Sequence, residues 1–465
     1  MTQQRANEEA ATLIPLSGNP GESRRSMISA TFNFINSIVG SGIVGLPYAL
    51  NQAGLPFGLL LLIAVGFITG VCVSLVMDCN VYFQKLESIT LFWLVVADYS
   101  IILLIKGGEL SGTNSYQSLV QSTFGLPGFL ILSALQFLYP FIAMISYNIT
   151  TGDTLTKVFQ RIPGVGPGHP LADRHFVIIL TTILFTLPLS LYRNIARLGK
   201  VSFFSMVLTL IILIVAIVRA ATLGPEILPT EDAWTFARLN SIQAVGVMSF
   251  AFICHHNSFL IYGSLEKPTL AKWAQVTHVS VGSALFISAV FAVAGYTTFT
   301  GFTQGDIFEN YCRDDNLATF GRFCFALSII TTFPLECFVT REVTTNVICN
   351  QELSRYKHLA LTTLIVTVCT SLSLTFDCLG VVLELNGVLS ATPLIFIIPS
   401  ACFLKLSPGS WLQGEKLLSI ILIVIGLFVM IIGLTMTGLF PQDCSHGVEM
   451  FYCPNANVTG TAPPV

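Results

Sequence analysis

Polar side chains that could bind an ion or a zwitterion interrupt the apolar stretch FNFINSIVGSGIVGLPYAL, residues 32–50. The stretch carries Asn33 and then Gly40, Ser41 and Gly42. Glycine permits unusual backbone conformations, so a helix here is predicted to break near its middle. The half-helix after the break would direct N–H groups at an anion, and the half before it would offer carbonyls to a cation. The alternative is a close-packing seam of small residues.

A second apolar stretch, FAFICHHNSFLIY, also carries polar residues. It places Phe252, Cys254, His255 and His256 within one predicted span. Ionisable residues inside a membrane are costly and are candidates for functional sites. We expect His255 to be functional, and we expect His256 only to cap the helix or to reach the cytosolic interface.

A third candidate lies in IITTFPLECF, residues 329–338. Pro334 has no N–H, so the carbonyl of Ile330 loses its helical partner. The hydroxyls of Thr331 and Thr332 are predicted to lie beside that carbonyl, and such oxygens are ligands that a small cation prefers. In the alternative interpretation the threonines bond back to their own helix.

Glu384, in VVLELNGVLSATP, is a carboxyl group within a further apolar run. It could carry a proton, or it could pair near the outer interface without taking part in function.

The two predicted breaks, near residues 41 and 255, occupy corresponding positions in two halves of the sequence. Transporters built from inverted repeats carry interrupted helices in such positions, with the solute between them. The sequence therefore predicts a solute site halfway across a membrane.

Composition defines the elements that must position this site. The chain has 465 residues, of which 53% are hydrophobic and 10% are charged, with a net charge of −3. These values are typical of an all-α polytopic membrane protein and give no basic stripe for nucleic acid. Apolar runs lie at 28–50, 55–77, 89–105, 124–147, 175–192, 198–218, 239–262, 275–299, 318–338, 359–376, 380–404 and 417–440.

Charge distribution predicts the orientation. Lysine and arginine concentrate in alternate loops, and none follows Lys416, so the N-terminal tail (1–26) is predicted to be cytosolic and the C-terminal tail (441–465) extracytosolic, flanking a membrane domain at 27–440. The sequon at Asn457 predicts glycosylation of that tail. Opposite sides require an odd number of crossings, so one of the twelve runs should not span. The weakest is 89–105.

Two features of the loops remain open. Lys157, Arg161 and Arg174 fall in a loop that is predicted to be outside, against the general charge rule. Cys444 and Cys453 lie in the outer tail and are candidates for a disulfide if it faces an oxidising compartment.

Three motifs in these stretches resemble those of the sodium-coupled neutral amino acid transporters, within the amino acid/auxin permeases. They are NSIVGSGIVGLPYALNQAG, FAFICHHN and LIFIIPSACFLKL, and the likeness runs from about residue 30 to 453. The resemblance implies about eleven helices in a five-plus-five inverted-repeat, leucine-transporter-like fold. It also implies coupled movement of a small neutral amino acid by a monomer in the lipid bilayer, without a cofactor other than sodium.

Site residues follow from the resemblance by position. Asn33 matches the first-helix asparagine that is linked to sodium, Thr332 matches the eighth-helix threonine, and His255 matches the histidine of the sixth-helix pattern. Sodium is expected between the first helix, including Val39, and Thr331 with Thr332. Substrate is expected at the two breaks, and a proton moving the opposite way would use His255 or Glu384. The expected substrate residues are Gly40, Ser41, Gly42, Phe252, Cys254 and His255.

One departure from the family is large. Its second helix runs directly from a start like Ala53–Leu62 to an end like Ile105–Gly108, whereas here residues 62–91 or nearby intervene. Two full crossings in this region would invert everything downstream, so we interpret the intervening segment as an insertion.

Competing functions are an amino acid sensor that does not transport, at an endolysosomal membrane, and a membrane enzyme. The N-terminal EEAATLI resembles an acidic dileucine sorting signal, which leaves the plasma membrane and endolysosomes both open. No H-E-x-x-H motif or nucleophile elbow occurs in the sequence, so we expect no enzyme.

Overall fold

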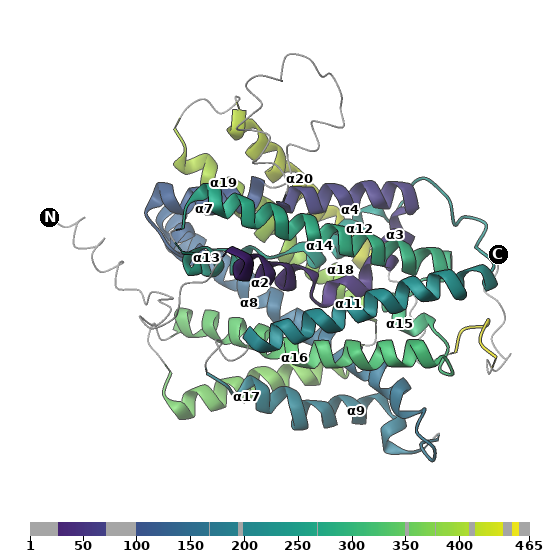
Figure 1. The fold of residues 1–465 in the computed structure, drawn as a ribbon. Coiled ribbons are helices and arrows are strands. Elements are labelled where there is room, and N and C mark those ends of the chain that lie inside the picture. The colour runs from purple at the N-terminus through teal and green to yellow at the C-terminus, as the bar shows by residue number, and fades with distance from the viewer. Residues whose placement is uncertain are drawn as a thin grey trace.

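The computed structural model contains helices and connecting loops, with no strand among the residues it describes. It describes residues 27–70, 99–166, 168–193, 199–266, 268–348, 353–376, 378–408, 414–439 and 449–454. The helices form one bundle in which most axes run in a similar direction (Figure 1). This architecture confirms the predicted all-α polytopic class.

Six helical stretches in the described residues are long and apolar enough to cross a membrane. One of them is composite, because two π-helical segments, η7 and η8, interrupt it. The six are α8 (Tyr116–Phe159), α11 (Gly199–Thr222), α14 (Leu270–Phe299), α16 (Asn316–Ile348), α20 (Gly414–Leu439), and the series α18 (Leu379–Asn386), η7 (Gly387–Ala391), η8 (Pro393–Ile397) and α19 (Ile398–Leu406).

Shorter pieces complete the bundle. The first predicted span consists of α2 (Met27–Val39), η1 (Ser41–Gly45) and α3 (Leu46–Ala53). The others are α4 (Leu55–Gly70) with α7 (Tyr99–Ser111), α9 (Arg174–Thr181) with η3 (Thr182–Thr186) and α10 (Leu187–Ser190), α12 (Ser241–Phe252) with α13 (His255–Ser264), and α17 (Arg355–Ser373). With the long helices, the described residues form eleven such groups.

The helices α4 and α7 flank the predicted insertion. They contact each other, and both pack against α14 in the upper part of the bundle (Figure 1). Helix α4 continues to Gly70, so the first residues of the predicted segment 62–91 are ordinary helix. Its remainder lies outside the described residues, as do the tails 1–26 and 455–465 with the sequon at Asn457.

A cap covers one end of the bundle, the end that is predicted to be extracytosolic. It comprises η6 (Thr300–Phe302), α15 (Ile307–Asn310) and the tail segment 449–454, which lies beside α15 at the right of Figure 1. A disulfide joins Cys312 to Cys453, and the Tyr452 hydroxyl donates to the Asn310 carbonyl at 2.7 Å. The predicted pairing of Cys444 with Cys453 is therefore wrong: the tail folds back over a loop 141 residues earlier, which local spacing does not reveal.

The three cations that contradicted the charge rule all have acidic partners in or below this cap. Lys157 pairs with Glu309 at 2.9 Å, Arg161 with Asp314 at 2.9 Å, and Arg174 with Asp153 at 2.5 Å. Each of these cations is thus part of an ion pair, and the loop remains an exception to the predicted orientation.

Asp306, in the cap, begins α15 by accepting from the Phe308 N–H at 2.9 Å. Burial and then the neighbouring Glu309 raise the pKa of Asp306 to about 7, against the opposing effects of that N–H, Lys157 and Arg322. This carboxyl group therefore titrates near neutral pH.

Candidate functional site

The first predicted break is present. Helix α2 ends at Val39, Gly40 has φ −30° and ψ −143°, and a 3₁₀ helix starts at Ser41 before α3 continues. A Cβ placed on Gly40 would meet no atom within 4 Å, so open space lies beside the break. The end of α2 and the start of η1 thus face each other across a non-helical residue, as the glycines predicted.

The second predicted break is also present. Helix α12 ends at Phe252, Ile253 is extended with φ −70° and ψ 124°, and Cys254 has φ −141° and ψ 5° before α13 starts at His255. Phe252, Cys254 and His255 are all fully buried. Here the helix is interrupted without glycine, at positions where only the polar run Cys-His-His-Asn indicated it.

The two broken spans pack directly on each other. A Cβ on Gly42 would lie 2.6 Å from the Cα of Ala251, so only glycine allows this approach. Asn257, on α13, donates to the Ser37 hydroxyl of α2 at 2.9 Å. The breaks are therefore neighbours in the fold. The hydrogen bond from Asn257 to Ser37 also connects the half-helices α2 and α13.

The two histidines differ in their surroundings. The Nε2 of His255 lies 2.9 Å from the Ser100 hydroxyl of α7, so this side chain faces the second span. His256 stacks obliquely on Tyr139 of α8, with 5.3 Å between ring centroids. Its Nδ1 is buried without a hydrogen-bond partner. Sequence reasoning therefore missed His256, which packs inside the bundle and not at an interface.

The predicted sodium residues lie on α2 and α16. Val39 is buried at the end of α2. Thr332 donates to the Ser328 carbonyl at 2.8 Å, and Thr331 donates to the carbonyls of Leu327 and Ser328. The threonines thus bond back to their own helix, as the alternative interpretation held. A donating hydroxyl keeps its lone pairs, so either oxygen can still bind a cation. The side chains of Asn33 and Ser41 lie outside the described part of the chain.

Glu384 is fully buried in a network that joins several helices. Its carboxylate accepts from Tyr48 at 3.1 Å and from Gln52 at 2.5 Å, both on α3. Gln243 of α12 donates to the second oxygen at 3.4 Å, and Thr437 of α20 donates to it at 3.5 Å. These donors fit an ionised carboxylate that holds α3 and α12, one half of each broken span, in place.

A second intramembrane carboxyl group was missed. Glu336, on α16, lies close enough to Tyr139 to act on its hydroxyl electrostatically, and its Oε2 is buried without a partner. Glu336 lies in the same motif as the threonines, IITTFPLECF. The sequence prediction used only the residues before Pro334 and therefore did not include it.

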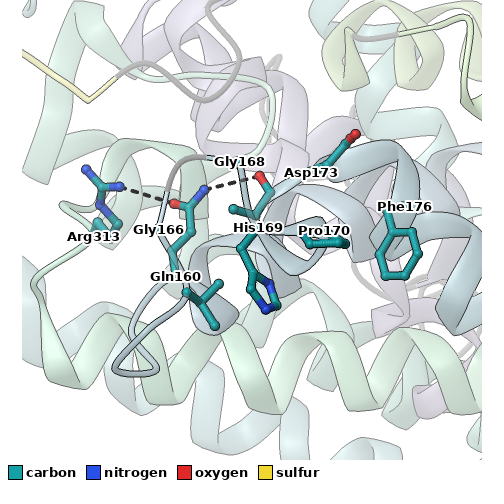
Figure 2. A pocket seen from close by; sticks show the side chains of 10 residues that line it. Gln160, Gly166, Gly168, His169, Pro170, Asp173, Phe176 and Arg313 are labelled. Atoms are coloured by element: carbon teal, nitrogen blue, oxygen red, sulfur yellow. Dashed lines mark hydrogen bonds between the residues drawn. The ribbon is translucent and has the colours of Figure 1, made fainter.

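A separate pocket of about 620 Å³ lies at the capped end of the bundle, between the loop after α8 and Arg313. Figure 2 shows Gln160 between Arg313, which donates to it at 3.4 Å, and the backbone carbonyl of Ala172, to which it donates at 3.4 Å. His169, Asp173 and Phe176 line the same pocket (Figure 2). The residues that line this pocket are distant in sequence from both breaks, and none of them is a predicted site residue.

A family model described as "Transmembrane amino acid transporter protein" matches residues 23–439, which includes both breaks, Thr332 and Glu384. The chain belongs to this family. Its class of activity is therefore amino acid transport through a membrane. The family consists of transporters, which confirms the prediction that the chain is not an enzyme.

Relatives extend over nearly the whole chain. It is 64% identical over 440 residues to "Putative sodium-coupled neutral amino acid transporter 11" of Danio rerio, covering 94% of this chain and 92% of the relative. The Homo sapiens protein of that name is 57% identical over 415 residues, covering 89% and 95%. "Vacuolar amino acid transporter 2" of Saccharomyces cerevisiae is 29% identical over 448 residues, covering 93% and 86%.

Solved structures show the same fold at low identity. MhsT in complex with L-phenylalanine aligns with a TM-score of 0.52 and 14% identity, over 89% of this chain and 99% of that one. The Eremococcus coleocola manganese transporter aligns with a TM-score of 0.52 and 11% identity, over 92% and 91%. These similarities confirm the predicted leucine-transporter-like architecture.

Proposed function

We propose that this protein is a secondary active transporter that moves small neutral amino acids, coupled to sodium, with a proton moving the opposite way. The observation that carries the proposal is the direct contact of two broken spans through Gly42 and Ala251, with open space beside Gly40. The printed names of the vertebrate relatives support the substrate class and the coupling ion.

The geometry of the breaks suits a zwitterion. The starts of η1 and α13 direct N–H groups and a positive dipole end into the region between them, where a substrate carboxylate would bind. The ends of α2 and α12 offer carbonyls to the substrate ammonium group. Gly40, Ser41 and Gly42 on one span, and Phe252, Cys254 and His255 on the other, would surround the molecule.

Sodium would bind between α2 and α16. The carbonyl of Val39, the hydroxyl oxygens of Thr331 and Thr332, and Asn33 would supply the oxygen ligands, which hard cations prefer. Ser205 of α11 supports this position, because its hydroxyl lies 3.4 Å from that of Thr332. No cofactor besides sodium is proposed, and one chain supplies every residue of the site, so we expect a monomer to suffice.

The compartment is also part of the proposal. We expect an intracellular membrane of the endolysosomal type, because the relative from Saccharomyces cerevisiae is named as a vacuolar transporter. The plasma membrane is the other outcome of a localisation experiment on the tagged full chain.

Transport into proteoliposomes tests the function. Radiolabelled alanine or glutamine should accumulate above empty vesicles when an inward sodium gradient is present, and collapse of that gradient should remove the accumulation. Uptake that stays the same after collapse would disprove sodium coupling. Binding of substrate without any net flux would instead favour the sensor.

A further inference from the structure

Three ionisable groups inside the bundle are candidates to carry a proton, and their hydrogen bonds distinguish them. Glu384 accepts from four side-chain donors. His255 is fully buried against Ser100. A group held by several partners in one geometry must break those bonds to exchange a proton, at a cost of roughly 1 kcal/mol or more for each neutral bond. Glu384 is therefore poorly placed for the role that the sequence suggested. His255 has one such partner and an unpartnered Nδ1, but it has no exposed surface through which to exchange a proton.

Glu336 differs from both in its partners. Its Oε2 is buried with no hydrogen-bond partner, and no described residue forms an ion pair with it. It lies four residues beyond the centre of α16, about 6 Å along the axis. An ionised carboxylate at this depth is costly without a counter-charge, so the group must either bind a cation or take up a proton.

One aromatic side chain connects Glu336 to the second break. Glu336 and His256 are both half-buried, so neither residue is closed off on every side. Tyr139 lies 5.3 Å from the His256 ring, measured between centroids, and interacts electrostatically with Glu336. The second break, through His256, is thus linked to the carboxyl group.

We propose that Glu336 is the proton-binding residue of the transport cycle, with Tyr139 and His256 as its neighbours on the side of the second break. The proton adds to Oε2 of the ionised carboxylate to give a neutral acid, and it leaves to water on the opposite side when the bundle reorients. This inference rests on the proposed amino acid transport and assigns its proton to a residue that neither the motifs nor the resemblance indicated.

The neighbouring titratable groups leave this role to Glu336. On α8 the facing groups are Tyr139 and, farther along, Tyr147, and the second break adds Cys254 and His256. Charged and thiol groups on the other helices packed against α16 have other charged or thiol groups as neighbours. Arg219 of α11 pairs with Asp315, His358 of α17 lies beside Arg341, and Cys369 of α17 lies beside Cys337.

Position on the helix couples the proton to the cation. Thr332 and Glu336 are four residues apart on α16, so their side chains are neighbours on one face. A cation at Thr332 favours the ionised carboxylate, and a proton on Glu336 removes that attraction. Cation and proton therefore compete, which makes the two move in opposite directions.

The test uses the purified full chain in proteoliposomes with an internal pH dye. Addition of sodium and alanine outside should make the interior of wild-type vesicles more alkaline, and uptake should depend on external pH. Glu336→Gln should abolish the alkalinisation and the pH dependence and weaken sodium activation about tenfold. It should retain exchange of labelled alanine without gradients. Glu342→Gln, a change on the same helix, is the matched control and should behave as wild type.

The outcomes separate this inference from the proposed function. Proton movement that persists in Glu336→Gln would overturn the assignment, as would wild-type transport without any proton movement, and amino acid transport would stand in both cases. Wild-type protein without labelled exchange would overturn the function and the assignment with it. If Glu336→Gln does not fold, Glu336→Asp decides: a shifted midpoint of the pH profile supports the assignment, and an unchanged midpoint overturns it.

Discussion

The cap and the middle of the bundle differ in whether a buried carboxylate has a partner of opposite charge. In the cap, Lys157 and Glu309 form a buried pair, and a disulfide joins the tail to the loop. In the middle of the bundle, Glu336 has no counter-charge among the described residues. Single buried polar atoms without a hydrogen-bond partner occur in both regions, on Asp306 and Glu309 in the cap and on His255, His256 and Glu336 in the middle.

The difference indicates where the molecule is built for stability and where it is built for binding. A buried carboxylate without a counter-charge is costly, so Glu336 marks a place where an ion or a proton completes the site. Changes in the cap should therefore lower stability, and changes at the midplane should alter transport in protein that still folds. The following predictions test that division.

The largest effect is expected where the two spans touch. In Gly42→Val the new Cβ would lie 2.6 Å from the Ala251 Cα, and only a shift of the backbone could relieve this clash. Uptake of labelled alanine should fall to the level of empty vesicles. Gly282→Val on α14, where a Cβ meets nothing within 4 Å, is the matched control and should transport normally. Equal uptake by both variants would show that the contact is not needed.

Removal of a buried cation in the cap should be nearly as severe for stability. Lys157→Met leaves Glu309 buried beside Asp306 without its partner, which should cost about 3 kcal/mol in the free energy of unfolding. The double variant Lys157→Met with Glu309→Leu removes both charges of the pair. It should recover part of the lost stability, measured as the temperature of thermal unfolding. Arg161→Met breaks a pair that is partly exposed and should cost less than about 1 kcal/mol. Similar losses for Lys157→Met and Arg161→Met would contradict the role of burial.

Loss of the cap disulfide should cost about 2 kcal/mol, since this bond closes a long loop. Cys453→Ser should lower the unfolding temperature, and mass spectrometry of unreduced wild-type protein should identify a cross-linked peptide that contains Cys312 and Cys453. A cross-link between Cys444 and Cys453 in its place would refute the described connection.

The smallest effect concerns pH. The raised pKa of Asp306, about 7, means that the folded protein binds a proton that the unfolded chain releases between pH 7 and about pH 4. Stability should therefore rise as the pH falls through 7, with a gain of a few degrees in unfolding temperature. Asp306→Asn imitates the protonated form, so its unfolding temperature should change less with pH. An equal pH response in both proteins would exclude Asp306 as the source.

Local patterns predicted much of the fold and of the site. Helix breaks depend on neighbouring residues, so the glycines at 40 and 42 and the polar run at 254–257 indicated both interruptions before any tertiary contact was known. The orientation was predicted from lysine and arginine counts and stays a prediction. The disulfide between Cys312 and Cys453 could not be predicted, because it depends on a tail returning over a distant loop.

The contact of Tyr139 with His256 was hidden for the same reason, since it joins α8 to α13 across the bundle. His255 and His256 are adjacent in sequence, and only the rotation of α13 determines which faces Ser100 and which faces Tyr139. The choice between Glu384 and Glu336 likewise required tertiary contacts, because the donors to Glu384 come from several different helices.

A series of substitutions at Gly40 tests the central claim most directly, namely that substrate binds between the two breaks. The space beside Gly40 accepts a Cβ without contact, so Gly40→Ala should exchange labelled alanine across proteoliposomes much as wild type does. Gly40→Leu should fill that space and lose exchange while its unfolding temperature stays close to that of wild type. Undiminished exchange by Gly40→Leu would contradict the account.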